Sequence, residues 1–345
     1  MIDNAYLSYS EGKYEAAPQR RSKKPSLAKR LKVTLFIVIP KVVYVLLACL
    51  VVIMWEFIQL LLPKKKKSVK GQVALVTGGG NGLGRALCMR LAKEGCSVAV
   101  CDIDLPNAEK TAKDIWESYG VKAKAFRADV GDESSIAELR KNIEATLGPV
   151  DILVNNAGLL AFLSLSQGST EDVKRIFDVN LMSHIWALRE FKPGMYERRR
   201  GHIVAISSIL SVLTSARSIS YNVTKAGVKT LMTSLREEII LDGLGDCVFT
   251  TCAYPTGILS RKDFYDLMKS MKISVPYLTP ERCAGYVIDA MLINQMDVIP
   301  GFFPAKLAFY LFPLVPASLA RMVTNQIVGK VPELMKSPAK DAKQS

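Results

Sequence analysis

The stretch Gln72–Gly95, QVALVTGGGNGLGRALCMRLAKEG, joins a short apolar strand, a glycine-rich turn and an amphipathic helix. Its glycines follow the pattern T-G-x-x-x-G-x-G, with Gly78, Gly82 and Gly84 at the marked positions. Glycines let the backbone approach a pyrophosphate, and the helix that follows supplies free N–H groups and positive potential. A glycine turn alone is a weak signal. The stretch nevertheless predicts the first unit of a dinucleotide-binding fold.

The end of the next strand strengthens this prediction. The segment CSVAVCDID ends its strand at Asp102, 18 residues beyond Gly84. A carboxylate there accepts hydrogen bonds from the ribose hydroxyls and repels a 2′-phosphate. Asn81, just ahead of Gly82, is not basic either. We therefore expect NAD rather than NADP, with an ordinary strand-end cap as the alternative role for Asp102.

Strand-like and helical segments alternate along most of the chain. The strand-like segments lie near residues 73–77, 97–102, 122–126, 151–154, 202–207, 247–253 and 297–299. Such alternation predicts an α/β fold, a Rossmann-type doubly wound parallel sheet of about seven strands that binds ligands at the strand carboxyl ends. We divide the chain into a disordered basic tail (1–30), a membrane anchor (31–63), a dinucleotide-binding catalytic domain (64–300), an apolar membrane-contacting segment (301–330) and a polar tail (331–345).

At NNAG (Asn155–Gly158) and YNVTK (Tyr221–Lys225) the chain resembles the classical short-chain dehydrogenase/reductase family. The resemblance runs from about Gly71 to Pro300 and rests on an ordered set of motifs. They are TGGGNGLG, Asp102, ADV at Ala128–Val130, NNAG, Asn180, Ser208, and Tyr221 with Lys225. The apolar segments on both sides make the chain similar to the branch with the 17-beta-hydroxysteroid dehydrogenases 11 and 13 and the membrane retinol dehydrogenases.

The spacing of the family's catalytic residues fits acid–base chemistry on an alcohol. Tyr221 and Lys225 are four apart on a predicted helix and so share a face. A nearby ammonium lowers the pKa of a tyrosine, so Tyr221 would take the alcohol proton in oxidation and return it in reduction. The resemblance implies that Ser208 holds the substrate oxygen and that Asn180 is a station in a water relay to Lys225. The ordinary alternatives are a solvated surface pair for Tyr221 and Lys225 and a cap for Ser208 or Asn180.

The resemblance also implies a set of cofactor contacts. They are Thr77, Gly78, Gly82, Leu83, Gly84, Asp102, Asp129, Val130, Asn156, Ala157, Gly158, Tyr221, Lys225 and Pro255. Two positions depart from the family pattern. Ser211 replaces a common glycine, and the stretch that borders the nicotinamide is shortened to Pro255-Thr256-Gly257. These departures put cofactor geometry and substrate specificity in question more than the catalytic assignment.

Charge and hydropathy predict a membrane surface as partner. The net charge is +14, and residues 1–70 contribute +10 of it. Because these basic residues flank an apolar segment, we expect anionic lipid headgroups and not nucleic acid. The uninterrupted apolar core, Val42–Trp55, is shorter than the roughly 20 residues of a spanning helix. We favour a monotopic or hairpin insertion that turns near Pro40, with a full span as the alternative. Both basic clusters and the catalytic domain would then face the cytosol, on the endoplasmic reticulum or a lipid droplet.

A lipid-bound enzyme gains effective concentration of a substrate that partitions into lipid. We therefore expect an oxidoreductase that exchanges a hydride between NAD and a lipophilic alcohol or carbonyl, such as a retinoid, a steroid or a related lipid. The alternative is a nucleotide-binding scaffold on the same membranes with little turnover. Residues Arg261–Leu278 would form a lid over the substrate. The family implies a homodimer through the helices that carry Asn180 and Tyr221.

The metal-binding residue types indicate no metal site. None of the seven cysteines forms a C-x-x-C pair, and the chain has two histidines. We interpret the cysteines as small buried hydrophobic residues in a reducing compartment. His184 and His202 are interpreted as structural or exposed.

Overall fold

The computed structural model describes residues 26–27, 34–61, 64–160, 169–214, 218–258, 277–301, 303–316 and 318–319. The chain divides into two compact units, Met1–Lys64 and Lys65–Ser345. The predicted tail 331–345 and most of the predicted tail 1–30 lie outside the described residues. So does the predicted lid, apart from Tyr277 and Leu278.

The first unit is helical. A π-helical turn, η1 (Thr34–Val38), passes directly into α2 (Ile39–Leu61). Our prediction of a turn near Pro40 is therefore wrong. Proline is tolerated in the first turn of an α-helix, because the N–H that it lacks has no partner within the helix there. No helix in the part of the chain that the structure describes combines the length and apolarity needed to cross a membrane.

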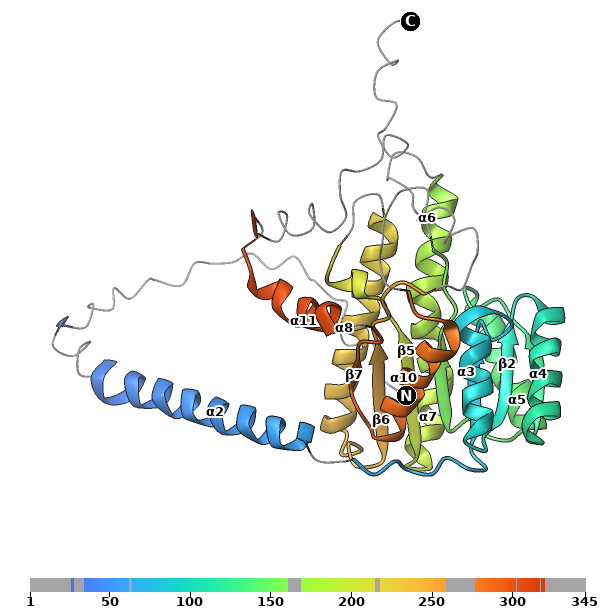
Figure 1. The fold of residues 1–345 in the computed structure, drawn as a ribbon, viewed down its shortest axis with the longest axis horizontal. Helices are drawn as coiled ribbons and strands as arrows, with labels where there is room; N and C mark the ends of the chain where they lie inside the picture. Colours follow the sequence, from blue (N-terminus) through green and yellow to red (C-terminus); the bar gives the residue numbers. More distant parts are fainter. Residues whose placement is uncertain are drawn as a thin grey trace, which may run out of the picture. The chain divides into compact units, whose positions relative to one another are not determined.

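The second unit contains one parallel sheet (Figure 1). Its strands run in the order β3-β2-β1-β4-β5-β6-β7, and every neighbouring pair is parallel. The strands are β1 (Val73–Thr77), β2 (Ser97–Asp102), β3 (Ala123–Arg127), β4 (Ile152–Asn155), β5 (Gly201–Ile206), β6 (Val248–Ala253) and β7 (Asp297–Val298). The strand order reverses between β1 and β4, which is where ligands bind in such sheets, at the strand carboxyl ends. The predicted fold class and all seven strand positions are confirmed.

Helices cover both faces of the sheet. They are α3 (Gly82–Lys93), α4 (Leu105–Tyr119), α5 (Glu133–Thr146), α6 (Thr170–Phe177), α7 (Ser183–Glu197), α8 (Ile219–Leu241) and α10 (Pro280–Leu292). Side chains of α3, α4 and α10 fill the core on one face, and those of α5, α7 and α8 fill it on the other. The central strands are buried on both faces, which is why β1 and β4 read as continuous apolar runs instead of alternating ones.

The lysine run ahead of β1 contacts the sheet domain. Lys66 Nζ lies 2.9 Å from Asp289 Oδ1 on α10, and the Lys67 backbone N–H donates to the Leu292 carbonyl at 2.8 Å. Lys67 Nζ lies 2.8 Å from His202 Nδ1 and 4.7 Å from the centre of the Phe249 ring. The sequence assigned this basic flank, Lys64–Lys67 and Lys70, to lipid headgroups and did not predict these contacts of Lys66 and Lys67 with the protein. Acidic and aromatic partners far along the chain hold them on the protein.

After β7 the chain forms α11 (Phe303–Leu311) and a 3₁₀ turn, η4 (Phe312–Leu314). Phe309 is buried, with its ring 4.5 Å from that of Tyr254 at the end of β6. Leu307, Tyr310 and Leu311 are exposed on the same helix. One side of α11 therefore packs on the domain while the other presents apolar side chains.

Candidate active site

The glycine-rich turn between β1 and α3 has a backbone that other residues cannot adopt easily. Gly78 and Gly82 have positive φ angles of 65° and 52°. A Cβ on Gly84 would lie 1.8 Å from the Gly78 carbonyl oxygen, so only glycine fits there. Asn81 caps α3 without a side-chain hydrogen bond, and Leu83 is buried at the first turn of the helix. The turn thus brings bare backbone and a helix N-terminus to one place, as a pyrophosphate requires.

Hydrogen bonds to Thr77 connect this turn to the NNAG motif. Thr77 Oγ1 accepts hydrogen bonds from the backbone N–H groups of Asn156 and Ala157, at 3.0 and 3.1 Å. Asn156 Nδ2 in turn donates to the Thr77 and Gly78 carbonyl oxygens, at 2.9 and 3.2 Å. The two motifs lie about 80 residues apart in sequence, and these bonds join them where the strand order reverses. The Asn156 side chain thereby shapes the cofactor site through the backbone.

Asp102 ends β2 beside the same turn. Its Oδ2 accepts from the Gly80 backbone N–H at 2.8 Å, and its Oδ1 accepts from Asp104 N–H at 3.1 Å. The register of β2 and β3 places exposed Arg127 directly beside Asp102. Sequence reasoning missed Arg127, because its closeness to Asp102 depends on strand pairing. The carboxylate favours ribose hydroxyls, whereas a guanidinium beside it can bind a phosphate.

Asp129 and Val130 follow β3. Asp129 Oδ1 accepts from Gly131 N–H at 2.9 Å and from Arg175 Nη2 on α6 at 2.9 Å. Burial opposes ionisation, but the bonds from Arg175 and Gly131 hold the pKa of Asp129 below its ordinary value. Arg175 was not among the predicted site residues. Through its bond to Asp129, Arg175 holds in place the loop that the family resemblance assigns to cofactor binding.

The predicted catalytic residues come together at the carboxyl end of β5. Ser208 follows β5 and caps a short 3₁₀ turn, η3 (Ile209–Ser211), while Tyr221 and Lys225 are one turn apart on α8. A hydrogen bond from Ser208 is among the effects on the pKa of Tyr221. Lys225 Nζ donates to the Ile206 carbonyl at 2.9 Å and lies 5.8 Å from the centre of the Tyr221 ring. The arrangement joins a proton donor, a hydroxyl that can hold an oxygen and a buried cation.

The charges within this cluster differ from our expectation. Burial raises the pKa of Tyr221, and the bond from Ser208 offsets this rise only in part. Burial also lowers the pKa of Lys225 to about 8, against a smaller opposite effect from Cys252. The pKa of Tyr221 in the protein alone is therefore raised and not lowered as we predicted, because desolvation outweighs the hydrogen bond from Ser208. A low tyrosine pKa would require the positive charge of a bound oxidised nicotinamide as well.

Asn180 lies in a π-helical turn, η2 (Asp178–Met182), between α6 and α7. Its side chain is fully buried and bonds both backbone groups of Leu159, accepting from N–H at 2.7 Å and donating to the carbonyl at 2.8 Å. A Cβ on Gly158 would lie 3.4 Å from Asn180 Oδ1 and 3.5 Å from Lys225 Nζ. Asn180 and Lys225 therefore both lie beside Gly158. Short π-helical turns recur at functional sites, and neither this turn nor the role of Leu159 was predicted from the sequence.

The shortened stretch after β6 borders the serine loop. The Pro255 carbonyl accepts from Ile209 N–H at 3.0 Å, one residue beyond Ser208. Thr256 N–H donates to the Pro300 carbonyl at 3.2 Å. A Cβ on Gly257 would lie 2.7 Å from the Tyr277 ring. The departure from the family pattern is therefore accommodated next to the candidate site by contacts with the chain around β7 and Tyr277.

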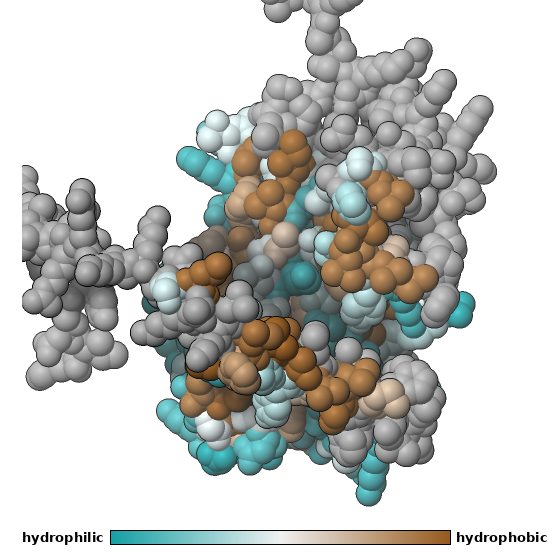
Figure 2. Space-filling model, turned by 90° about the vertical axis from the view of Figure 1, so that its left-hand side faces the viewer, coloured by the Kyte–Doolittle hydropathy of each residue, from teal (hydrophilic) through white to brown (hydrophobic). Residues whose placement is uncertain are grey.

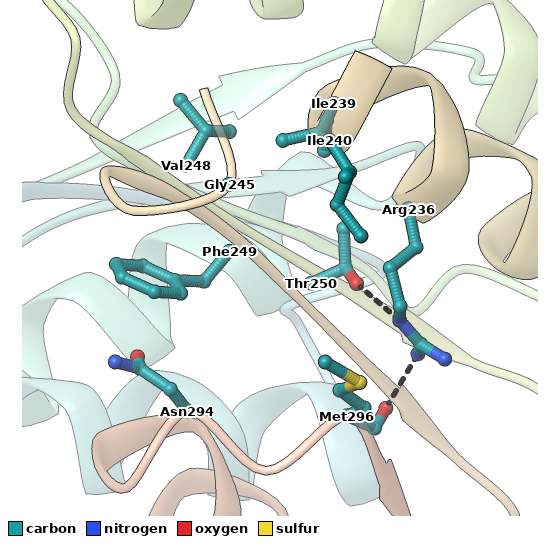
Figure 3. A pocket seen from close by; sticks show the side chains of 9 residues that line it. All are labelled: Arg236, Ile239, Ile240, Gly245, Val248, Phe249, Thr250, Asn294 and Met296. Atoms are coloured by element: carbon teal, nitrogen blue, oxygen red, sulfur yellow. Dashed lines mark hydrogen bonds between the residues drawn. The ribbon is translucent and has the colours of Figure 1, made fainter. Parts of the chain in front are cut away.

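A separate small pocket lies at the opposite end of β6 (Figure 3). Val248, Phe249 and Thr250 line it from the strand, with Ile240 and Met296 beside them. Arg236 donates to Thr250 Oγ1 at 3.2 Å and to the Met296 carbonyl at 3.1 Å. Because it lies at the amino end of the strand, this pocket is remote from Ser208 and Tyr221 and contains none of the predicted site residues.

Comparison with known proteins agrees with this geometry. The family model described as short chain dehydrogenase matches residues 72–261. Human estradiol 17-beta-dehydrogenase 11 is 29% identical over 77% of this chain and 86% of the relative. Bovine short-chain dehydrogenase/reductase family 16C member 6 is 29% identical over 75% of this chain and 81% of its own length. A metagenomic short-chain oxidoreductase solved in complex with NADP has a TM-score of 0.57 and 28% identity, over 68% of this chain and all of its own.

The family match spans more than half of the chain and includes both the glycine-rich turn and the cluster around Tyr221. The parallel sheet, its reversal point and the catalytic cluster are arranged as nicotinamide chemistry requires. The chain belongs to the short-chain dehydrogenase family and is an NAD(P)-dependent oxidoreductase.

Proposed function

We propose that this protein oxidises a lipophilic secondary or allylic alcohol, or reduces the matching carbonyl, with NAD at a membrane surface. The observation that carries the proposal is the convergence of Ser208, Tyr221 and Lys225 at the end of β5, with Asn180 behind them. A scaffold with little turnover has no physical need for this set, so the structure gives that alternative no specific support.

Ser208, Tyr221 and Lys225 would each have a separate role in proton transfer. The Ser208 hydroxyl would donate a hydrogen bond to the substrate oxygen and so stabilise the negative charge that develops on it. Tyr221 would exchange the proton with that oxygen, and Lys225 would stabilise the phenolate from one turn away. Bound nicotinamide supplies the site that accepts or gives the hydride.

The cradle formed by Gly78, Gly82 and Gly84 fits a dinucleotide, because a side chain at Gly84 would collide with the Gly78 carbonyl. Asp102 supports NAD, since its carboxylate would repel a 2′-phosphate. Two facts favour NADP instead. Arg127 lies beside Asp102 in the sheet, and the metagenomic short-chain oxidoreductase was solved in complex with NADP. We propose NAD as the preferred cofactor because the carboxylate is bonded into the glycine-rich turn itself.

A lipophilic substrate and a membrane surface are supported by three features. One relative, the human protein, is named estradiol 17-beta-dehydrogenase 11. Leu307, Tyr310, Leu311 and Leu314 are exposed at helical spacing along α11 and η4. Apolar side chains are also exposed along α2. Figure 2 shows several apolar patches on the side of the molecule that lies on the left in Figure 1. We propose the cytosolic surface of the endoplasmic reticulum or a lipid droplet.

A homodimer through the helices that carry Asn180 and Tyr221 remains part of the proposal. Ile219 and Val223 support it, because they are exposed four residues apart on α8 and so form an apolar pair on one face.

The direct test is product formation by membrane-bound protein from a panel of retinols, hydroxysteroids and long-chain alcohols, with a sugar alcohol as the polar control. We expect NAD-dependent product from at least one lipophilic class and none from the sugar alcohol. Turnover of the sugar alcohol alone would contradict the proposed substrate class. NAD binding without turnover of any alcohol would favour the scaffold.

A further inference from the structure

Two buried polar side chains, His184 on α7 and Asn155 on β4, have nitrogens with no hydrogen-bond partner in the part of the chain that the structure describes. His184 is 1% exposed and neither of its ring nitrogens is bonded. Asn155 is 3% exposed and its Nδ2 is unbonded. Nearly all buried polar groups bond to protein or to ordered water, and leaving one unpaired costs about 1–3 kcal/mol. A bound water would remove this cost for both side chains.

Both side chains point into the same layer of the core. Leu153 precedes Asn155 by two residues on β4 and belongs to the cluster between the sheet and α7 and α8, so strand alternation places Asn155 on that face. Ala187 and Leu188, three and four residues after His184 on α7, belong to the same cluster. His184 follows Asn180 by one helical turn along η2 and α7, and Asn180 Oδ1 and Lys225 Nζ both lie beside Gly158.

The other histidine provides an internal comparison. His202 is also buried, but its Nδ1 lies 2.8 Å from Lys67 Nζ and its Nε2 lies 2.9 Å from Thr251 Oγ1. It is a satisfied structural histidine. His184 is equally buried, but neither of its ring nitrogens has a hydrogen-bond partner among the described residues.

The hydrogen-bond donors and acceptors of these side chains fit a water molecule. Burial, and then Lys225, lowers the pKa of His184 to about 3, so the ring is neutral and has one donor and one acceptor. Lys225 has three N–H donors and gives one to the Ile206 carbonyl. Asn155 Nδ2 only donates. A water can accept from Lys225 and Asn155 and donate to the bare ring nitrogen, and a second water can accept from the ring N–H.

We propose that Asn155 and His184 bind internal water beside Lys225 and that His184 is a positioning residue for the catalytic ammonium. The water would give Lys225 a second hydrogen-bond acceptor inside the protein and favour its charged form. The inference rests on the role proposed for Lys225 but on no particular substrate.

The first test is spectroscopic and needs no substrate. With ¹⁵N-histidine labelling, NMR shows ring signals from two histidines, assigned through a His184→Gln variant. We expect His184 to be a single neutral tautomer at neutral pH, with hydrogen-bonded ring nitrogens whose shifts change in Lys225→Met while those of His202 do not. Ring nitrogens with the shifts of unbonded groups, or shifts indifferent to Lys225→Met, would overturn the proposal.

The second test is the pH profile of kcat on the alcohol that the panel identifies. The titratable groups that face Lys225 are Tyr221 on α8, Cys252 on β6 and His184 on α7, and burial moves their pKa values away from neutrality. We therefore expect activity to fall near pH 8 on the alkaline side and assign this fall to Lys225. His184→Phe should move this fall about one pH unit lower, because it removes the water that stabilises the ammonium. His184→Gln keeps a side chain that can bond the water, so activity should again fall near the pH seen in the parent protein.

Ser183→Ala is the matched control, since Ser183 is the neighbouring buried polar residue and its hydroxyl donates to the Val179 carbonyl, one turn earlier in η2. It should leave the profile unchanged. Equal losses of kcat in His184→Phe and His184→Gln with no shift of the profile would mean a packing role and overturn the inference. If melting shows that His184→Phe does not fold, the His184→Gln profile and the NMR result decide. Inactivity of the parent protein on every alcohol would count against the proposed function and leave the NMR test valid.

Discussion

Lys225 Nζ donates a hydrogen bond to the carbonyl oxygen of Ile206, the last residue of β5, at 2.9 Å. This bond fixes the ammonium to the sheet one helical turn away from Tyr221. The same strand leads through Ser207 into Ser208, and Ser207 Oγ donates to the Lys225 backbone carbonyl at 2.8 Å. The strand end and α8 are thus bonded to each other twice, so the serine and the tyrosine keep a fixed separation.

Replacing Lys225 with methionine should lower kcat by roughly 10²–10⁴-fold, the range for loss of acid–base assistance. The ammonium that stabilises the phenolate would be gone, and the Ile206 carbonyl would lose its partner. In the parent protein the burial-lowered pKa of about 8 means that activity should fall as pH rises through that value. Steady-state rates across pH check both points. A Lys225→Met profile that kept the alkaline fall would contradict the assignment of that fall to Lys225.

Asp102→Asn should shift cofactor preference from NAD toward NADP. Asparagine can still accept from the Gly80 N–H, but it no longer repels a 2′-phosphate, and Arg127 remains beside it. The measurement is the ratio of kcat/KM for the two cofactors. Asp104→Asn is the control, because it removes a charge two residues away that caps α4. An unmodified protein that already used NADP better would refute the proposed NAD preference.

Much of the fold and of the candidate site could be predicted from local sequence. The strands, the glycine-rich turn and the Tyr221–Lys225 spacing are short-range patterns, and the structure has them where they were expected. The bonds that shape the site could not be predicted, because Thr77 with Asn156 and Asn180 with Leu159 meet only through long-range packing. The raised pKa of Tyr221 escaped prediction for the same reason, since burial is a property of the whole fold.

Arg175→Ala should weaken dinucleotide binding several-fold with little change in melting temperature. The Arg175–Asp129 pair is part-exposed, and such pairs contribute about 0–1 kcal/mol to folding. Without this ion pair, the loop that carries Asp129 would be held less firmly. Arg189→Ala is a matched control, because Arg189 pairs with Glu133 at 3.0 Å on a more exposed surface. Equal effects of the two variants on cofactor affinity, measured by titration, would remove Arg175 from the site.

The topology is tested by tags placed before Met1 and after Ser345. Protease added to sealed microsomes should digest both, because both basic flanks and the catalytic domain are proposed to face the cytosol. Detergent-opened microsomes provide the control for tag accessibility. Protection of the C-terminal tag would place the domain in the lumen, and protection of the N-terminal tag alone would mean a full span.

The most direct test of the central claim is Tyr221→Phe, which removes one hydroxyl and leaves the ring. The measurement is oxidation of the best lipid alcohol by parent and variant, with NAD affinity determined on the same preparations. We predict that kcat falls by several orders of magnitude while NAD affinity and melting temperature stay close to those of the parent. A variant that oxidised the alcohol as fast as the parent would contradict the assignment of Tyr221 as the proton-transferring residue, and with it the proposed mechanism.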